Sequence, residues 1–191
     1  MTQKAISTAM VLAAGLGTRM RPLTLDRPKA LVDVGGRALI DHVLDRLVVA
    51  GVRRAVINVH AFADLLEAHV KRRQDLEIVI SDERAQLMET GGGVRQALPL
   101  LGSGPILVAN IDSIWEEPAG SAIARLVAGY DPARMGARLM LADRGACLGY
   151  DGAGDFAQDE GGQIRFRDGA EQVQQVYTGV QVVDPAAVAQ E

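Results

Sequence analysis

Two glycines and several cations lie close together near the start of the chain and could hold a polyphosphate. Gly15 and Gly17 follow an apolar run that ends at Leu12, which is typical of a buried strand opening into a backbone turn. Such a turn exposes backbone N–H groups, and glycines let a phosphate approach the main chain closely. The cations that can neutralise the remaining charge are Arg19, Arg21 and Lys29. The stretch therefore predicts a triphosphate site.

The two commonest phosphate loops do not fit this stretch. A dinucleotide-binding fingerprint needs a small residue where Met20 stands, and a Walker loop needs a Gly-Lys-Ser/Thr string that the sequence does not contain. The whole string from Leu12 to Thr24, followed by Pro28-Lys29, instead resembles the signature of the sugar-1-phosphate nucleotidyltransferases. The plainer alternative is a glycine-rich turn with basic residues on the surface.

Asp112 follows another apolar run and is the candidate metal ligand. A carboxylate placed directly after a buried strand, at a phosphate site, can hold Mg²⁺, which takes one or two carboxylates together with phosphate oxygens and waters. The alternative is an aspartate that caps the next turn together with Ser113. The resembled family usually has glycine before this aspartate, whereas this chain has Ile111.

The string Glu89-Thr90-Gly91-Gly92-Gly93 leads into a predicted helix. Glycines there cost backbone entropy, about 0.5–1 kcal/mol each, so something should require the bare backbone. The string resembles the base-reading loop of the family, in the form that its bacterial N-acetylmuramate-1-phosphate uridylyltransferases of cell-wall recycling have. A flexible connector is the alternative, and Glu89 itself could be a solvated surface charge.

Two later segments match positions where the resemblance implies sugar contacts. Asp155 is suited to accept hydrogen bonds from sugar hydroxyls, and it follows Gly154. Thr178 and Gly179 could offer a hydroxyl and an accessible backbone. For Asp155 the competing account is an aspartate that stabilises a hairpin turn.

The resemblance implies a Mg²⁺-dependent reaction in which a sugar 1-phosphate attacks a nucleoside triphosphate and pyrophosphate leaves. Asn58 joins the candidates because it lies at the end of a predicted strand, on the same edge as the phosphate loop. The implied catalytic residues are Arg19, Lys29 and Asp112, of which Asp112 also binds the metal. The implied nucleotide-binding residues are Leu12, Ala13, Ala14, Gly15, Gly17, Thr18, Arg19, Lys29, Asn58, Glu89, Gly91, Gly92 and Asn110. The implied sugar-binding residues are Asp112, Gly154, Asp155, Thr178 and Gly179.

The elements that must position these residues alternate between strand and helix. The predicted strands cover 8–13, 55–59, 76–80 and 106–109, and the predicted helices cover 39–48, 63–70 and 92–98, with Pro99 helping to end the last. Near-continuous apolar strands separated by helices indicate an α/β fold with a mostly parallel, Rossmann-like sheet and helices on both faces. Ligands of such sheets lie beyond the carboxyl ends of the strands.

The pattern of predicted elements changes near residue 137. Strand candidates at 139–141, 163–166 and 173–183 have no helix between them, and a loop rich in Gly and Asp covers 150–162. We expect one nucleotidyltransferase domain over 1–191, with a nucleotide-binding core over about 1–136 and an antiparallel, sugar-binding flap over about 137–184. We also expect the family's C-terminal tail, which supplies a second acidic metal ligand, to be absent.

The amino-acid composition argues against some classes of binding partner. An apolar content of 48%, a charged content of 23% and a net charge of −4 argue against a nucleic-acid-binding protein. No apolar run reaches the roughly 18 residues of a membrane span. The single cysteine, Cys147, excludes an internal disulfide and favours a reducing compartment, so we expect a cytoplasmic monomer or small homo-oligomer.

The sequence alone leaves several functions open. UTP and N-acetylmuramate 1-phosphate are the favoured substrates, and a mannose-1-phosphate guanylyltransferase or a glucose-1-phosphate thymidylyl- or uridylyltransferase is the alternative within the family. A non-catalytic regulatory domain that binds nucleotide sugars is an alternative from a different functional class. A Rossmann oxidoreductase would need a third glycine near Met20 and an acidic residue where Asn58 and His60 stand.

Overall fold

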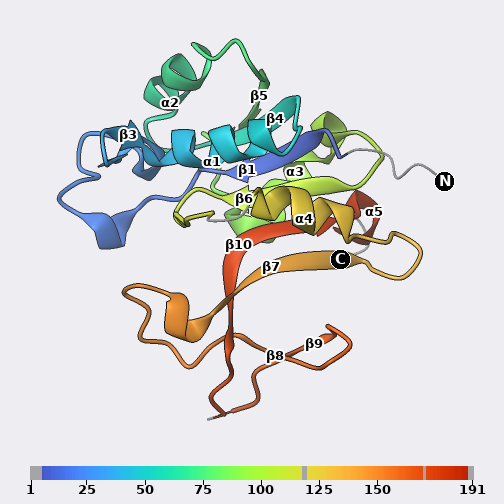
Figure 1. Ribbon diagram of the computed structural model, residues 1–191. Coiled ribbons are helices and arrows are strands. Elements are labelled where there is room, and N and C mark those ends of the chain that lie inside the picture. Colours follow the sequence, from blue (N-terminus) through green and yellow to red (C-terminus); the bar gives the residue numbers. More distant parts are fainter. Residues whose placement is uncertain (1–5, 118–119, 170, 189–191) are drawn as a thin grey trace.

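The predicted apolar strands form the parallel half of a large sheet (Figure 1). They are β1 (Thr8–Leu12), β4 (Arg54–Val59), β5 (Glu77–Asp82) and β6 (Ile106–Asn110). β1 pairs with β4 on one side and with β6 on the other, and β5 extends the sheet beyond β4. The computed structural model describes residues 6–117, 120–169 and 171–188.

The strand order β5-β4-β1-β6 reverses direction at β1. From β1 the chain moves outward to β4 and then to β5, and it returns through one helix to add β6 on the other side of β1. The carboxyl ends of β1 and β6 therefore point to the same edge while the loops that follow them diverge. Such a switch point is where open α/β sheets bind their ligands.

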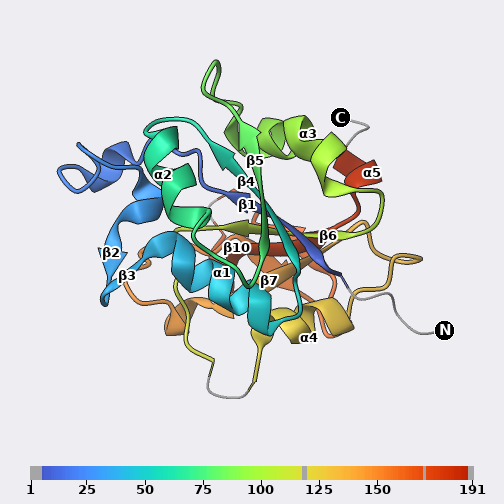
Figure 2. The ribbon, with the colours of Figure 1, turned by 90° about the horizontal axis from the view of Figure 1, so that it is seen from above.

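Helices cover both faces of the parallel strands, as predicted (Figure 2). The helices α1 (Leu39–Val49), α2 (Ala63–Val70) and α4 (Ala122–Ala128) belong to one core cluster with Val11, and α3 (Glu89–Leu101) belongs to a second cluster with Met10. Successive strand residues point to opposite faces, so Met10 and Val11 report the two sides of β1. The strands β1, β4 and β6 are thus buried on both faces, which is why they are mostly apolar, whereas the edge strand β5 is only partly buried.

The helix α3 is longer than predicted at both ends. It begins at Glu89, so the glycine run lies in its first turns and not in a preceding loop, and it continues through Pro99 to Leu101. Packing of Val94, Ala97 and Leu101 against the sheet outweighs the one hydrogen bond that Pro99 cannot donate. Gly102, with a φ of 80°, ends the helix in place of Pro99.

The second part of the chain adds antiparallel strands, which confirms the predicted flap as a structure. The strands are β7 (Ala137–Asp143), β8 (Phe156–Gln158), β9 (Ile164–Phe166) and β10 (Gln175–Val183). The second half of β10 runs antiparallel to β6, and its first half leaves the parallel strands and leads to the β8–β9 hairpin (Figure 1). The loop predicted over 150–162 was wrong in part, because β8 lies within it and pairs with both β9 and β10.

Short elements complete the described chain. They are the 3₁₀ turns η1 (Thr18–Met20), η2 (Lys29–Leu31) and η3 (Arg144–Ala146), the hairpin strands β2 (Asp33–Val34) and β3 (Arg37–Ala38), and the helix α5 (Pro185–Val188). Among the described residues, every helix is too short or too polar to cross a membrane.

A bulge in β10 brings the flap against the parallel strands. Between Tyr177 and Gln181 the pairing with β7 shifts, and Gly179 takes a φ of 82° within the bulge. A Cβ at Gly179 would lie 2.9 Å from both Cβ and Nδ2 of Asn110, at the end of β6. Close approach and backbone conformation together require glycine here.

We expect Gly179→Ala to lower the free energy of unfolding by about 1–3 kcal/mol, because it combines backbone strain with a clash. Chemical denaturation measures the change. Gly136→Ala is the matched control, since its Cβ would meet nothing within 4 Å and its backbone is not left-handed, so its stability should stay within about 0.5 kcal/mol. Equal stability of the two variants would contradict this account of the bulge.

Candidate active site

A buried side chain of β4 binds the backbone of the loop after β1. Asn58 is 2% exposed, and its Oδ1 accepts hydrogen bonds from the backbone N–H groups of Ala13 (2.6 Å) and Ala14 (3.2 Å). In the described part of the chain, the N–H groups of residues 15–19 have no protein acceptor. A Cβ at Gly15 would meet nothing within 4 Å, so the loop presents open backbone donors from Gly15 onward.

The Asn58 amide is itself fixed by a buried carboxylate. Glu83, which directly follows β5, is 1% exposed, and its Oε1 accepts a hydrogen bond from Asn58 Nδ2 at 2.9 Å. Its Oε2 accepts the N–H of Met88 at 3.1 Å, at the start of α3. Sequence reasoning missed Glu83, because the string Asp82-Glu83-Arg84 reads as a solvated charge cluster. Only its position after a strand at the ligand edge could have marked it.

Close packing on this pair explains one glycine at the start of α3. A Cβ at Gly93 would lie 2.9 Å from Asn58 Nδ2 and 2.9 Å from Glu83 Oε1. The bare backbone at Gly93 therefore lets the helix rest on the buried network. Gly92 and Gly91 lie one and two residues earlier and do not line the cavity described next.

A cavity of about 340 Å³ opens at the switch point between β1 and β6. Its walls come from the β1 loop, the end of β4, the start of α3, the end of β6 and η2. Of the predicted nucleotide-binding and catalytic residues, the structure brings together here Leu12, Ala13, Ala14, Gly15, Lys29, Asn58, Glu89, Asn110 and Asp112. Gly17, Thr18 and Arg19 lie further along the same loop and do not line it.

Lys29 and Asp112 form an ion pair in this cavity. Lys29 Nζ lies 2.6 Å from Asp112 Oδ2, with the lysine side chain 18% exposed and the aspartate 41% exposed. The two residues come from η2 and from the loop after β6, so the fold joins them across 83 positions of sequence. The pair places one cation and one carboxylate beside the open backbone donors. Phosphate oxygens bound there would replace Asp112 as the partner of Lys29.

The loop that carries Asp112 is anchored to α1. The guanidinium of Arg46 lies 4.8 Å from the ring centroid of Trp115 and binds Glu117 at 3.1 Å. Glu117 also accepts hydrogen bonds from Trp115 Nε1 (3.0 Å) and the Ala122 N–H (2.8 Å). Burial would raise the pKa of Glu117, but the hydrogen bonds from Trp115 and Ala122 and the charge of Arg46 together lower it. The carboxylate therefore stays ionised and holds the loop.

The donor set of the cavity fits a metal that arrives with phosphates. The described residues contain no group of three or more His, Cys, Asp or Glu side chains that could hold an ion by themselves. Asp112 and Glu89 are the acids that line the cavity, and Mg²⁺ needs only one or two carboxylates when phosphate oxygens and waters complete its shell.

A second cavity, of about 350 Å³, lies on the flap. Its lining residues are Gly154, Asp155, Phe156, Phe166, Arg167 and Tyr177. Asp155 Oδ2 accepts the N–H of Tyr177 at 2.9 Å, which ties this carboxylate oxygen to β10. The other carboxylate oxygen accepts no side-chain or backbone hydrogen bond from the part of the chain that the structure describes. Burial raises the pKa of Tyr177 to about 12, so its hydroxyl stays neutral at physiological pH. Two of the predicted sugar-binding residues, Gly154 and Asp155, thus meet in one cavity.

Of the other predicted sugar-binding residues, Thr178 and Gly179 lie in the β10 bulge, and Asp112 lies in the first cavity. The Thr178 hydroxyl donates to the backbone oxygen of Met140 at 2.9 Å, which ties the bulge to β7. Gly179 abuts Asn110 of the first cavity. The bulge therefore stands between the two cavities, with its Thr178 hydroxyl proton already committed to the protein.

Comparisons with known proteins identify relatives of this chain. A family model described as nucleotidyl transferase matches residues 8–140. The N-acetylmuramate alpha-1-phosphate uridylyltransferase of Caulobacter vibrioides is 57% identical over 185 residues, which cover 95% of this chain and 76% of that protein. The protein of the same name from Neisseria meningitidis is 46% identical over 110 residues, covering 56% of this chain and 48% of its own.

A solved structure shares the fold. The inositol-1-phosphate CTP transferase of T. maritima superposes with a TM-score of 0.81 and covers 99% of this chain and 75% of its own, at 20% sequence identity. At that identity the likeness concerns the fold alone. It confirms the Rossmann-like α/β architecture that the strand pattern predicted.

We expect Asn58→Asp to lower the free energy of unfolding by about 2–4 kcal/mol near neutral pH, because it sets two carboxylates against each other in a buried place. Uptake of a proton by either carboxyl group restores a donor, so the deficit relative to the unchanged protein should shrink as the pH falls from 8 to 5. Denaturation at the two pH values measures it.

Asn110→Asp is the control for that variant, because Asn110 is only half-buried and, among the described residues, its side chain forms no hydrogen bond with a carboxylate. Its stability should change little between the two pH values. A deficit that is the same at pH 8 and pH 5 for Asn58→Asp would show that the Asn58–Glu83 contact is not what the substitution breaks.

Proposed function

The chain belongs to the nucleotidyl transferase family, and from this premise we propose that it joins UTP to N-acetylmuramate 1-phosphate and releases pyrophosphate. The observation that carries the choice of substrates is the identity of 57% over 95% of the chain to the Caulobacter uridylyltransferase. The geometry supports it, because the first cavity offers phosphate-binding groups and the second lies on the flap of the same sheet.

The reaction follows from the groups in the first cavity. A phosphate oxygen of the sugar 1-phosphate attacks the α-phosphorus of UTP in line. A new phosphorus–oxygen bond forms there, and the bond to the bridging oxygen breaks, so pyrophosphate leaves with its electron pair. The protein positions the two phosphates and neutralises their charge without forming a covalent intermediate.

Individual residues have separate parts in this scheme. The open N–H groups of residues 15–19 receive the triphosphate, and Arg19 neutralises the departing pyrophosphate. Lys29 exchanges the Asp112 carboxylate for phosphate oxygens when the substrates bind. Asp112 and the phosphates would then hold Mg²⁺, which supplies further positive charge at the reacting oxygens when bound.

The remaining assignments complete the proposal. Residues 1–191 act as one domain, in which the part up to about 136 holds the nucleotide and the strands over about 137–184 hold the sugar. Asn58 acts by holding the loop, and Glu89, Thr90 and the first turns of α3 face the base. The setting we propose is peptidoglycan recycling in the cytoplasm, by a monomer or small homo-oligomer.

Pyrophosphate release tests the function. With Mg²⁺ present, UTP, dTTP, GTP and CTP are each combined with the 1-phosphates of N-acetylmuramate, N-acetylglucosamine, mannose and glucose. We expect UTP with N-acetylmuramate 1-phosphate to give the highest kcat/KM. Preference for another pair, such as GTP with mannose 1-phosphate, would contradict the substrates, and silence across the panel with UTP still bound would support a regulatory domain instead.

We expect Lys29→Ala and Asp112→Ala each to lower kcat at least about a hundredfold, because each removes a charge that acts on the reacting phosphates. Lys71→Ala is the matched control, since Lys71 also pairs with a carboxylate at 2.6 Å but on the surface of α2. Its kcat should not change. Circular dichroism checks that all three variants fold, and full activity of the first two would remove the proposed mechanism.

A further inference from the structure

Arg167 is a cation of the flap that backbone oxygens hold in place. Its Nε donates to the Gly154 oxygen at 3.2 Å, and one terminal nitrogen donates to the Gly169 oxygen. Within residues 6–117, 120–169 and 171–188, no carboxylate forms an ion pair with it. By contrast, Arg165, on the same hairpin, binds Glu171 at 2.7 Å. Two backbone oxygens therefore aim the Arg167 guanidinium and leave its other donors free.

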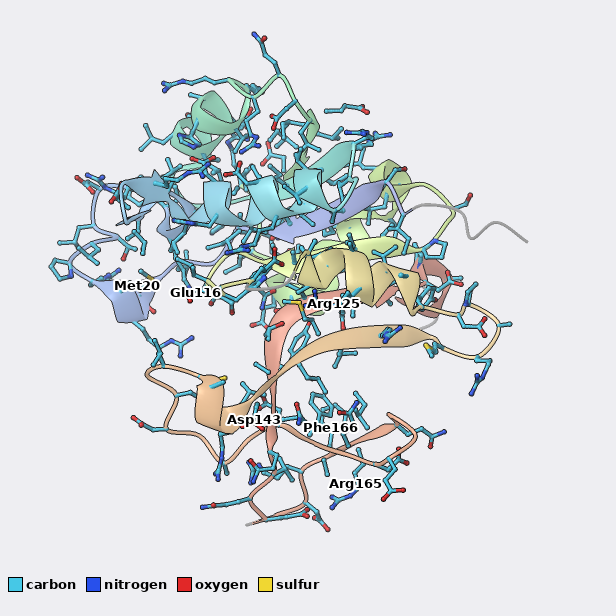
Figure 3. All side chains as sticks on the ribbon, viewed as in Figure 1. Met20, Glu116, Arg125, Asp143, Arg165 and Phe166 are labelled. Atoms are coloured by element: carbon cyan, nitrogen blue, oxygen red, sulfur yellow. The ribbon has the colours of Figure 1, made fainter. Side chains whose placement is uncertain are left out.

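Arg167 lines the second cavity together with two phenylalanines. Phe156 and Phe166 stack with ring centroids 4.8 Å apart, and both line the second cavity beside Arg167. Phe166 is 79% exposed, although it is a large apolar side chain. Figure 3 shows Phe166 and Arg165 projecting from the hairpin in different directions. An exposed aromatic ring beside an exposed guanidinium offers an organic anion an apolar contact and a charge-assisted hydrogen bond.

The β10 bulge connects the second cavity to the first. Tyr177 lines it, and two residues further along β10 Gly179 touches Asn110 of the first cavity. Two residues of a strand cover about 7 Å. The bulge thus gives a sugar whose 1-phosphate lies beside Lys29 a path along β10 toward the cavity that Arg167 lines.

We propose that Arg167 binds the carboxylate of an acidic sugar substrate, and this rests on the proposed function. N-acetylmuramate differs from N-acetylglucosamine by one lactyl ether, which adds a carboxylate to the sugar. Asp155 has a free oxygen for a hydroxyl and Arg167 has free donors for that carboxylate, so the cavity holds a matched set. Arg167 is thus a specificity-determining residue that selects the acidic sugar over its neutral counterpart.

The test compares kcat/KM for N-acetylmuramate 1-phosphate and N-acetylglucosamine 1-phosphate, each with UTP. Arg167→Ala should lower the value for the acidic sugar roughly ten- to hundredfold, as for loss of one charged hydrogen-bonding contact, and leave the neutral sugar nearly unchanged. Arg167→Lys keeps the charge but not the two-pronged geometry, so its loss should be intermediate. Arg165→Ala, on the same hairpin, should change neither value.

Each result bears on the proposal. An equal loss for both sugars would assign Arg167 to the structure of the hairpin and overturn the inference, and so would an unchanged value for N-acetylmuramate 1-phosphate. Turnover of that substrate by the unchanged enzyme is measured first. Its absence would refute the proposed function and the inference together, whereas its presence with an insensitive Arg167→Ala variant would refute the inference alone.

Discussion

The buried side-chain amide of Asn58 joins the segments on which the candidate active site is built. It accepts from the backbone of the β1 loop, donates to Glu83 after β5 and, through Glu83, reaches the first turn of α3. The Asn58 and Glu83 side chains are both buried, so loss of either partner would leave a polar atom without compensation. The β1 loop and the start of α3 are therefore tied to the same pair of side chains, and Gly93 is the residue that lets the helix approach them.

The fold and the ligand edge could be predicted from local pattern. Apolar runs alternating with helical periodicity indicated the parallel sheet, and the Gly15-x-Gly17 loop with Lys29 and Asp112 indicated a phosphate site at its edge. These signals are local or depend only on strand order. The burial of Glu83, the start of α3 at Glu89 and the strand β8 depend on tertiary contacts that periodicity does not encode. Asn58 was correctly placed at the edge, but only the structure shows its amide bound to the loop.

The strand β10 links the two halves of the site. Its second half belongs to the sheet beside β6, its first half belongs to the flap, and the bulge between them touches Asn110. The two cavities differ in charge balance. The cation of the first, Lys29, is paired with Asp112, whereas the cation of the second, Arg167, is held by backbone oxygens alone. This difference supports the two proposed roles: Lys29 exchanges its carboxylate partner for a phosphate, and Arg167 binds the carboxylate of the sugar.

A crystal structure of the chain with UTP and Mg²⁺ tests the central claim most directly. The account predicts the triphosphate against the N–H groups of residues 15–19, with Lys29 Nζ moved from Asp112 onto a phosphate oxygen and the Asn58–Glu83 contact unchanged. A nucleotide bound outside this cavity, or one bound within it while Lys29 and Asp112 stay 2.6 Å apart, would contradict the account.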